Sequence, residues 1–122
     1  MKIDLSNNEW KLMNRLWQDA PMTITELTAA LKEENGWSKN TVITMLSRLE
    51  GKGAVRHEEG LRAKRYYPAV KREDAIEAET ETFLDKVGGL GLLMNAMVEK
   101  NALTEDDIAE LSAILEKAGG KT

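Results

Sequence analysis

Two helix-start signals near the beginning of the chain restrict what its N-terminal part can form. Ser6 is followed three residues later by Glu9, and Thr23 is followed three residues later by Glu26. In this capping-box pattern the two side chains and the backbone amides at a helix start satisfy each other's hydrogen bonds. Each box also opens a run whose apolar residues recur every three or four positions. The sequence therefore predicts two short amphipathic helices.

Both predicted helices have a clear end and one apolar face. Pro21 ends the first helix because proline cannot continue it, and Gly36 ends the second. Each helix is expected to pack through its apolar face. The residues on these faces are Trp10, Leu12, Met13, Leu16 and Trp17 in the first helix, and Ile24, Leu27, Ala30 and Leu31 in the second.

A third helix is predicted in the stretch WSKNTVITMLSRLEGKGAV, residues 37–55, with Ser38 as its cap and its end at Gly51 or Gly53. Successive residues are spaced by about 100° around a helix, which gathers the apolar side chains on one side. That buried face consists of Val42, Met45, Leu46 and Leu49. The opposite arc consists of Asn40, Thr41, Thr44, Ser47 and Arg48. No acid lies on this arc, whereas a solvated face usually mixes Glu and Lys.

Two short strands are predicted next, at residues 54–59 and 63–69, with a turn near Glu59 and Gly60. Pro68 ends the second strand or places it at an edge. Three helices and a hairpin make a winged helix-turn-helix domain in residues 1–70. The expected fold class is thus mainly α with a small β-hairpin.

Positive charge is concentrated where a polar helix and the hairpin are predicted. The chain has a net charge of −4, yet residues 37–70 contain seven Lys/Arg and three Asp/Glu. Hydroxyls, an amide and cations can contact phosphates and base edges, so double-stranded DNA is the expected partner. A merely solvated face, or a winged-helix module that binds another protein and only non-specific DNA, stays open as an alternative.

Residues 71–122 are predicted to form three more helices. Gly88, Gly89 and Gly91 interrupt the first of them before the second begins, and Thr104 caps the last. So few residues in short helices cannot build an adequate core. A symmetric homodimer would cover their apolar faces, so this segment is expected to be a three-helix dimerisation domain.

Several other functions lack support in the sequence. The chain has no cysteine and one histidine, His57, so no metal site or catalytic triad is expected. No nucleotide-binding glycine motif occurs, and no cofactor or enzymatic activity is expected. No apolar run has the length of a membrane span, so we expect no membrane insertion and a cytoplasmic location.

The segments LSNNEWKLMNRLWQ, TITELTAAL, WSKNTVITMLSRLEGKGAVRHEEG and YYP resemble the BlaI/MecI/CopY family of penicillinase-repressor-like regulators. A weaker similarity covers LLMNAMVEKNALTEDDIAELSAILEK. The resemblance implies a homodimeric repressor that binds an inverted-repeat operator and controls resistance or stress genes. By position, the implied DNA contacts are Lys39, Asn40, Thr41, Thr44 and Arg48 in the helix, and Arg62, Lys64 and Arg65 in the wing.

The resemblance also concerns dimerisation and induction. Copper-responsive members carry paired cysteines that this chain lacks. In β-lactam-responsive members a sensor-linked protease leads to a cut at an Asn-Phe bond before a VEK segment. Here VEK is kept at residues 98–100, but Asn95, Ala96 and Met97 precede it in place of the Asn-Phe pair, and the candidate cut falls at Ala96 and Met97. The predicted dimerisation residues are Phe83, Leu84, Val87, Leu90, Leu93, Met97, Leu111, Ile114 and Leu115.

Overall fold

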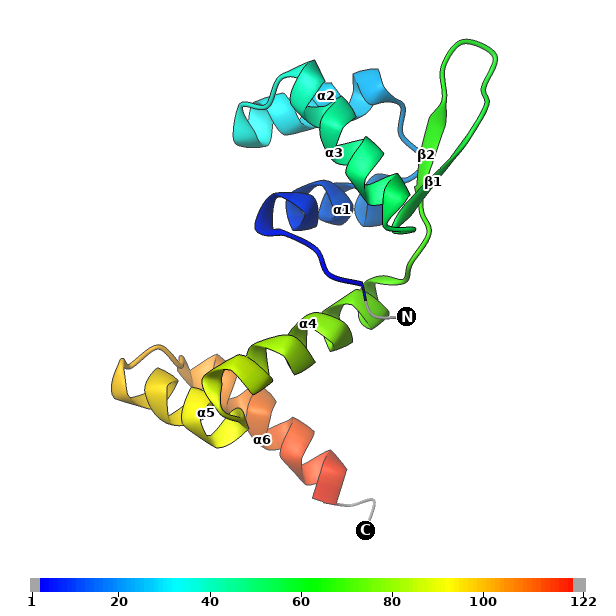
Figure 1. The fold of residues 1–122 in the computed structure, drawn as a ribbon. Coiled ribbons are helices and arrows are strands. Elements are labelled where there is room, and N and C mark those ends of the chain that lie inside the picture. Colours follow the sequence, from blue (N-terminus) through cyan, green and yellow to red (C-terminus); the bar gives the residue numbers. More distant parts are fainter. Residues whose placement is uncertain (1–2, 120–122) are drawn as a thin grey trace. The chain divides into compact units, whose positions relative to one another are not determined.

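The computed structural model describes residues 3–119 and shows six helices and one hairpin within them (Figure 1). In chain order the elements are α1 (Asn7–Asp19), α2 (Ile24–Asn35), α3 (Lys39–Gly51), β1 (Val55–Glu58), β2 (Arg65–Pro68), α4 (Arg72–Val87), α5 (Leu90–Glu99) and α6 (Glu105–Gly119). The chain divides into two compact units, Met1–Thr80 and Glu81–Thr122. The division falls inside α4, later than residue 70, because the start of α4 packs on the first unit and buries Ala75.

The predicted helix starts are confirmed by their hydrogen bonds. The Ser6 hydroxyl accepts from the amide of Glu9, whose carboxylate accepts from the Ser6 amide. Thr23 and Glu26 make the same reciprocal pair at α2. Ser38 caps α3 by accepting from the amide of Thr41. Each cap satisfies amides that the helix itself leaves unpaired, which sets where the helix begins.

The core of the first unit is formed by the apolar faces of its three N-terminal helices. Trp10 and Trp17 are only partly buried at its edge, and the indole N–H of Trp17 donates to the carbonyl of Val70 at 3.0 Å. This bond ties α1 to the chain just before α4. The fully buried side chains, all predicted for the core, are Leu12, Met13, Leu16, Leu27, Leu31, Val42, Leu46 and Leu49.

The hairpin pairs β1 and β2 antiparallel, with Val55 opposite Pro68 and Glu58 opposite Arg65. Both strands are shorter than predicted, so a six-residue loop (residues 59–64) replaces a tight turn. The loop needs glycine at position 60, because a Cβ there would overlap the Ala63 carbonyl oxygen. A β-bridge from Met22 to Tyr66, which the sequence did not predict, fastens β2 to the segment between α1 and α2.

The second unit contains the end of α4 together with α5 and α6. Gly88 and Gly89 have φ angles of +97° and +114°, which favour glycine and allow the chain to turn after α4. The predicted break at Gly91 is wrong, since Gly91 lies within α5. Thr104 accepts from the amide of Asp107 and starts α6 as predicted. Among residues 3–119, none of the helices combines the length and apolarity needed to cross a membrane.

Candidate nucleic-acid interface

Helix α3 is held against the core by one face. Val42, Met45, Leu46 and Leu49 are buried, with at most 8% of each residue's surface exposed. Gly36, with a φ angle of +72°, makes the left-handed turn that ends α2 and leads into α3. A short turn between two packed helices therefore determines which side of α3 faces outward.

The outward side of α3 presents the polar residues expected from sequence. Asn40, Thr44, Ser47 and Arg48 are all exposed. Thr41 is half-buried, and its hydroxyl lies 3.1 Å from that of Ser38. Of the predicted helix contacts, Thr41 thus has the least free side chain, because it takes part in the N-terminal cap. The roles of all these residues in DNA contact stay predictions.

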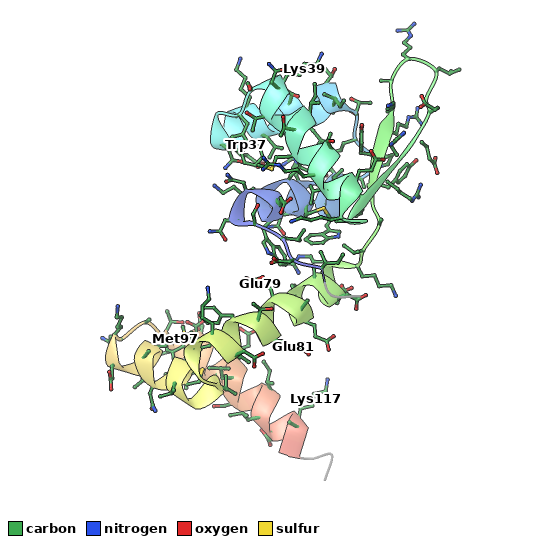
Figure 2. All side chains as sticks on the ribbon, viewed as in Figure 1. Trp37, Lys39, Glu79, Glu81, Met97 and Lys117 are labelled. Atoms are coloured by element: carbon green, nitrogen blue, oxygen red, sulfur yellow. The ribbon has the colours of Figure 1, made fainter. Side chains whose placement is uncertain are left out.

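The predicted wing cations lie in the loop between the two strands and at the first residue of β2. Arg62, Lys64 and Arg65 are exposed, and Leu61 at the tip is 105% exposed. In Figure 2, Lys39 lies at the top of the first unit, and this loop projects from the same end. Arg56 differs from them, since it binds Glu58 at 2.9 Å and lies 4.2 Å from the ring centre of Tyr67. Its charge is therefore already engaged within the hairpin.

A polar contact connects α3 directly to the hairpin. Nδ1 of His57, on β1, forms a hydrogen bond with Oε2 of Glu50 near the end of α3. The His57 ring also lies 5.5 Å from the ring of Tyr66. Burial, reinforced by the charges of Glu50 and Glu59, raises the pKa of Tyr66, so its phenol stays neutral. Glu50 is thus turned toward the hairpin, away from the acid-free arc of α3.

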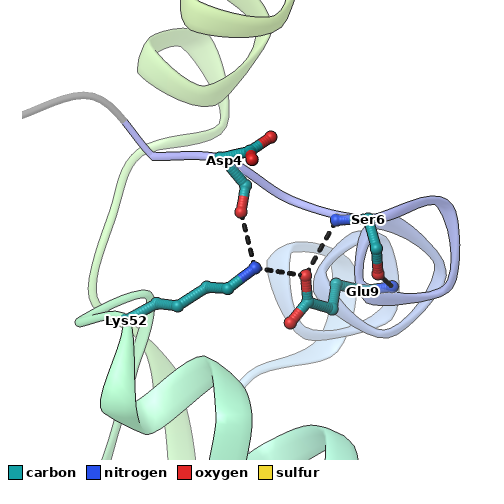
Figure 3. A network of polar contacts seen from close by, with 4 residues as sticks. All are labelled: Asp4, Ser6, Glu9 and Lys52. Carbon is teal, nitrogen blue, oxygen red and sulfur yellow. Dashed lines mark hydrogen bonds and ion pairs between the residues drawn. The ribbon is translucent and has the colours of Figure 1, made fainter.

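A second polar network anchors the C-terminal end of α3 (Figure 3). The ammonium of Lys52, the residue that caps α3, lies 2.6 Å from Oε1 of Glu9 and 2.7 Å from the carbonyl oxygen of Asp4. The Glu9 side chain is only 3% exposed, and the same oxygen accepts from the amide of Ser6. Both ends of α3 are therefore fixed by polar contacts, as a helix that positions side chains on a ligand requires.

A pocket of about 250 Å³ opens where α2, α3 and the wing loop meet. Its lining is formed by Ile24, Thr25, Lys39, Ala63 and Lys64. Thr25 was not predicted as a site residue, because no local pattern in the sequence distinguishes it from other surface threonines. Its place in the pocket depends on where the wing loop lies relative to α2.

The predicted dimerisation residues all lie in the second unit, on the end of α4, on α5 or on α6. Phe83, Leu90, Ile114 and Leu115 are exposed, and the others are half-buried. The predicted cut at Ala96 and Met97 falls inside α5. Within residues 3–119, His, Asp and Glu side chains form no cluster suited to a metal ion.

The fold and the candidate interface together define a winged helix-turn-helix protein, as predicted. Three helices pack so that the third exposes a polar, acid-free face, and a basic hairpin stands beside it. The model of one family, described as penicillinase repressor, matches residues 5–117. The chain belongs to this family, which confirms the resemblance found in the sequence.

Individual relatives agree with this assignment. The methicillin resistance regulatory protein MecI of Mammaliicoccus sciuri is 30% identical over 116 residues, covering 93% of this chain and 94% of the relative. The penicillinase repressor of Bacillus licheniformis is 31% identical over 115 residues, covering 93% and 90%.

Solved structures show the same fold. The DNA-binding domain of the repressor BlaI superposes with a TM-score of 0.56 at 30% identity, over 61% of this chain and 90% of that one. Monomeric Bacillus licheniformis BlaI in complex with the blaP half-operator gives 0.54 at 30% identity, with the same coverage. A mutant of S. aureus MepR, at 20% identity and a TM-score of 0.56, covers 97% of this chain and supports the fold alone.

Proposed function

We propose that this protein is a transcriptional repressor that binds operator DNA through α3 and the wing. One observation carries the proposal: the exposed arc of α3 holds Asn40, Thr44, Ser47 and Arg48 without a carboxylate. A helix of this kind fits the major groove, where Asn pairs with adenine, Arg with guanine, and a Thr methyl packs on thymine. A carboxylate on that arc would repel the phosphates on both sides of the groove.

The relatives support the same function. BlaI, whose DNA-binding domain shares this fold at 30% identity, has been solved in complex with a half-operator. MecI and the Bacillus licheniformis protein are named as a regulatory protein and a repressor. Bound near a promoter, a protein of this kind represses by occupying DNA that the transcription machinery needs.

We further propose that the second unit makes the protein a homodimer that reads an inverted repeat. Neither α5 nor α6 buries any side chain completely, while Leu90, Ile114 and Leu115 are more than half exposed. Apolar faces of this extent are covered in stable proteins, and a two-fold symmetric second copy is the commonest cover. Two copies of α3 related by a two-fold axis match half-sites about one helical turn apart, or a multiple.

Relief of repression by a sensor-linked protease is proposed as a separate step. A cut between Ala96 and Met97 would divide α5 and detach α6 from the proposed dimer surface. Because proteases bind extended peptide, α5 has to unwind locally before the bond is accessible. A chain that ends at Ala96 tests the consequence: it should be monomeric by light scattering and bind the operator more weakly than the full chain.

Selection from a random DNA pool tests the main proposal. The full chain is incubated with the pool at about 0.15 M salt, where non-specific phosphate binding is weakened, and the retained duplexes are sequenced. A two-fold symmetric motif is the expected result. Retention without any enriched motif would contradict a sequence-specific repressor and favour a winged-helix module that binds another protein.

A further inference from the structure

The pocket between α2, α3 and the wing loop joins two cations that are distant in the chain. Lys39 is the first residue of α3, and Lys64 is the last residue of the loop before β2. Both line the same pocket of about 250 Å³ together with Thr25 from the first turn of α2. A single small ligand in this pocket would therefore be in reach of side chains from three separate segments.

Charge in the pocket is unbalanced. None of its five lining residues is acidic. Within residues 3–119, neither lysine takes part in an ion pair or a side-chain hydrogen bond, in contrast to Lys52 and Arg56. Two ammonium groups that line one pocket with no acid between them repel each other. An anion between them would remove this repulsion and satisfy both cations.

The capping box at the start of α2 already uses two of the groups beside the pocket. The hydroxyl of Thr23 already accepts from the amide of Glu26, and the Glu26 carboxylate accepts from the Thr23 amide. The side chains of Lys39, Lys64 and Thr25 are left to hold a ligand: two cations and a hydroxyl donor. This combination suits a phosphodiester group, which carries one negative charge over two oxygens that accept several hydrogen bonds.

We propose that Lys39, Lys64 and Thr25 together hold one phosphodiester of the DNA backbone. This rests on the proposed DNA-binding function and adds a specific claim to it: the helix cation and the wing cation share a phosphate instead of each neutralising its own. Because the shared phosphate contacts both α3 and the wing loop, it sets the depth of α3 in the groove relative to the wing.

The slope of the logarithm of DNA affinity against the logarithm of salt concentration tests whether Lys39 and Lys64 bind the same phosphate. Each phosphate that a protein neutralises contributes about 0.9 to this logarithmic slope on B-DNA. The experiment measures this salt slope on the selected operator, per bound protomer. It compares the wild-type protein with Lys39→Gln, Lys64→Gln and the double variant. With one shared phosphate, each single variant keeps most of the slope and the double variant loses about 0.9. A loss near 1.8 in the double variant would overturn the proposal.

Arg62 provides a matched control, since it is an exposed wing cation that does not line this pocket. Slope losses of Lys39→Gln and Arg62→Gln should add. Thr25→Val should weaken binding without changing the slope, and Thr25→Ser should restore it. If the wild-type protein, Thr25→Val and Thr25→Ser bind the operator equally well, Thr25 does not contact the phosphate. The three-residue arrangement would then be wrong.

A neutral methylphosphonate placed at single positions of the operator locates the phosphate. At one position the methylphosphonate should weaken operator binding by the wild-type protein. At that same position it should not weaken binding by the double lysine variant any further. If no position shows this dependence, the shared phosphate is excluded. Failure of the underlying function looks different: the wild-type protein would then bind operator and random DNA alike, with a salt slope but no operator preference, and both proposals would fall together.

Discussion

The ammonium of Lys52, at the C-terminal cap of α3, lies 2.6 Å from Oε1 of Glu9, which sits in the first turn of α1 and is 3% exposed. The pair therefore connects the helix that faces DNA in our proposal to the start of the domain. Burial of the carboxylate acts to raise the pKa of Glu9, but hydrogen bonds from Lys52 and Ser6 outweigh it and hold this pKa below its usual 4.5.

Glu9→Ala should lower the free energy of unfolding by about 2 kcal/mol, because it leaves the Lys52 ammonium without its charged partner and removes the acceptor of the Ser6 amide in the capping box. Since the pKa of Glu9 is lowered on folding, its contribution is present above 4.5 and disappears as the pH falls through the lowered value. Urea unfolding of wild type and Glu9→Gln should therefore converge on acidification.

Glu58→Gln is the control for this stability experiment. Glu58 also has a lowered pKa, caused first by its hydrogen bond from Arg56, but it lies on the exposed surface of the hairpin. Solvent screens such a pair, so its loss should change the free energy of unfolding little at any pH. Equal effects of the two Gln variants would contradict a structural role for the buried pair.

Asn40→Ala should reduce the preference for operator over random DNA by about 1–3 kcal/mol, because it removes a contact to a base edge. Arg62→Ala should instead weaken binding to both DNAs alike and make the salt slope shallower, as a phosphate contact does. Fluorescence anisotropy with the two duplexes at several salt concentrations separates the two behaviours. Identical behaviour would mean that α3 and the wing have been given the wrong roles.

Leu115→Lys should convert a dimer into a monomer, because Leu115 is 68% exposed on α6 and a charge there cannot be buried between two copies. Helix content should stay the same by circular dichroism, and light scattering should report the mass of one chain. The control is Leu61→Lys: this apolar residue is also exposed, but it lies on the wing loop. If both variants remain dimeric, α6 does not form the dimer surface.

His57→Ala should weaken operator binding while leaving base preference unchanged. The substitution removes the contact between β1 and Glu50 of α3, so the wing is held less firmly relative to the helix. Glu59→Gln serves as the control, since Glu59 lies 3.9 Å from Nε2 of His57 and is 76% exposed. A change in the selected motif would instead indicate that His57 itself reads a base.

Much of the first unit could be predicted because its signals are local. Caps and apolar periodicity act over three or four residues, and they correctly placed α1, α2, α3 and the outward arc with Asn40 and Arg48. The hairpin was predicted, but its strands were drawn too long, because strand ends depend on which partner residues they reach. Gly91 was misplaced as a break since a single glycine can also be accommodated within a helix.

The sequence by itself determined the helices, the hairpin, the family and the acid-free face of α3. Only the tertiary structure decided which distant residues meet: Lys52 with Glu9, Met22 with Tyr66, and Lys39 with Lys64 around one pocket. The physical reason is that each of these relationships depends on how whole elements pack, and packing brings together side chains from several helices at once. A local pattern contains no information about such a partner, however clearly it marks where a helix begins.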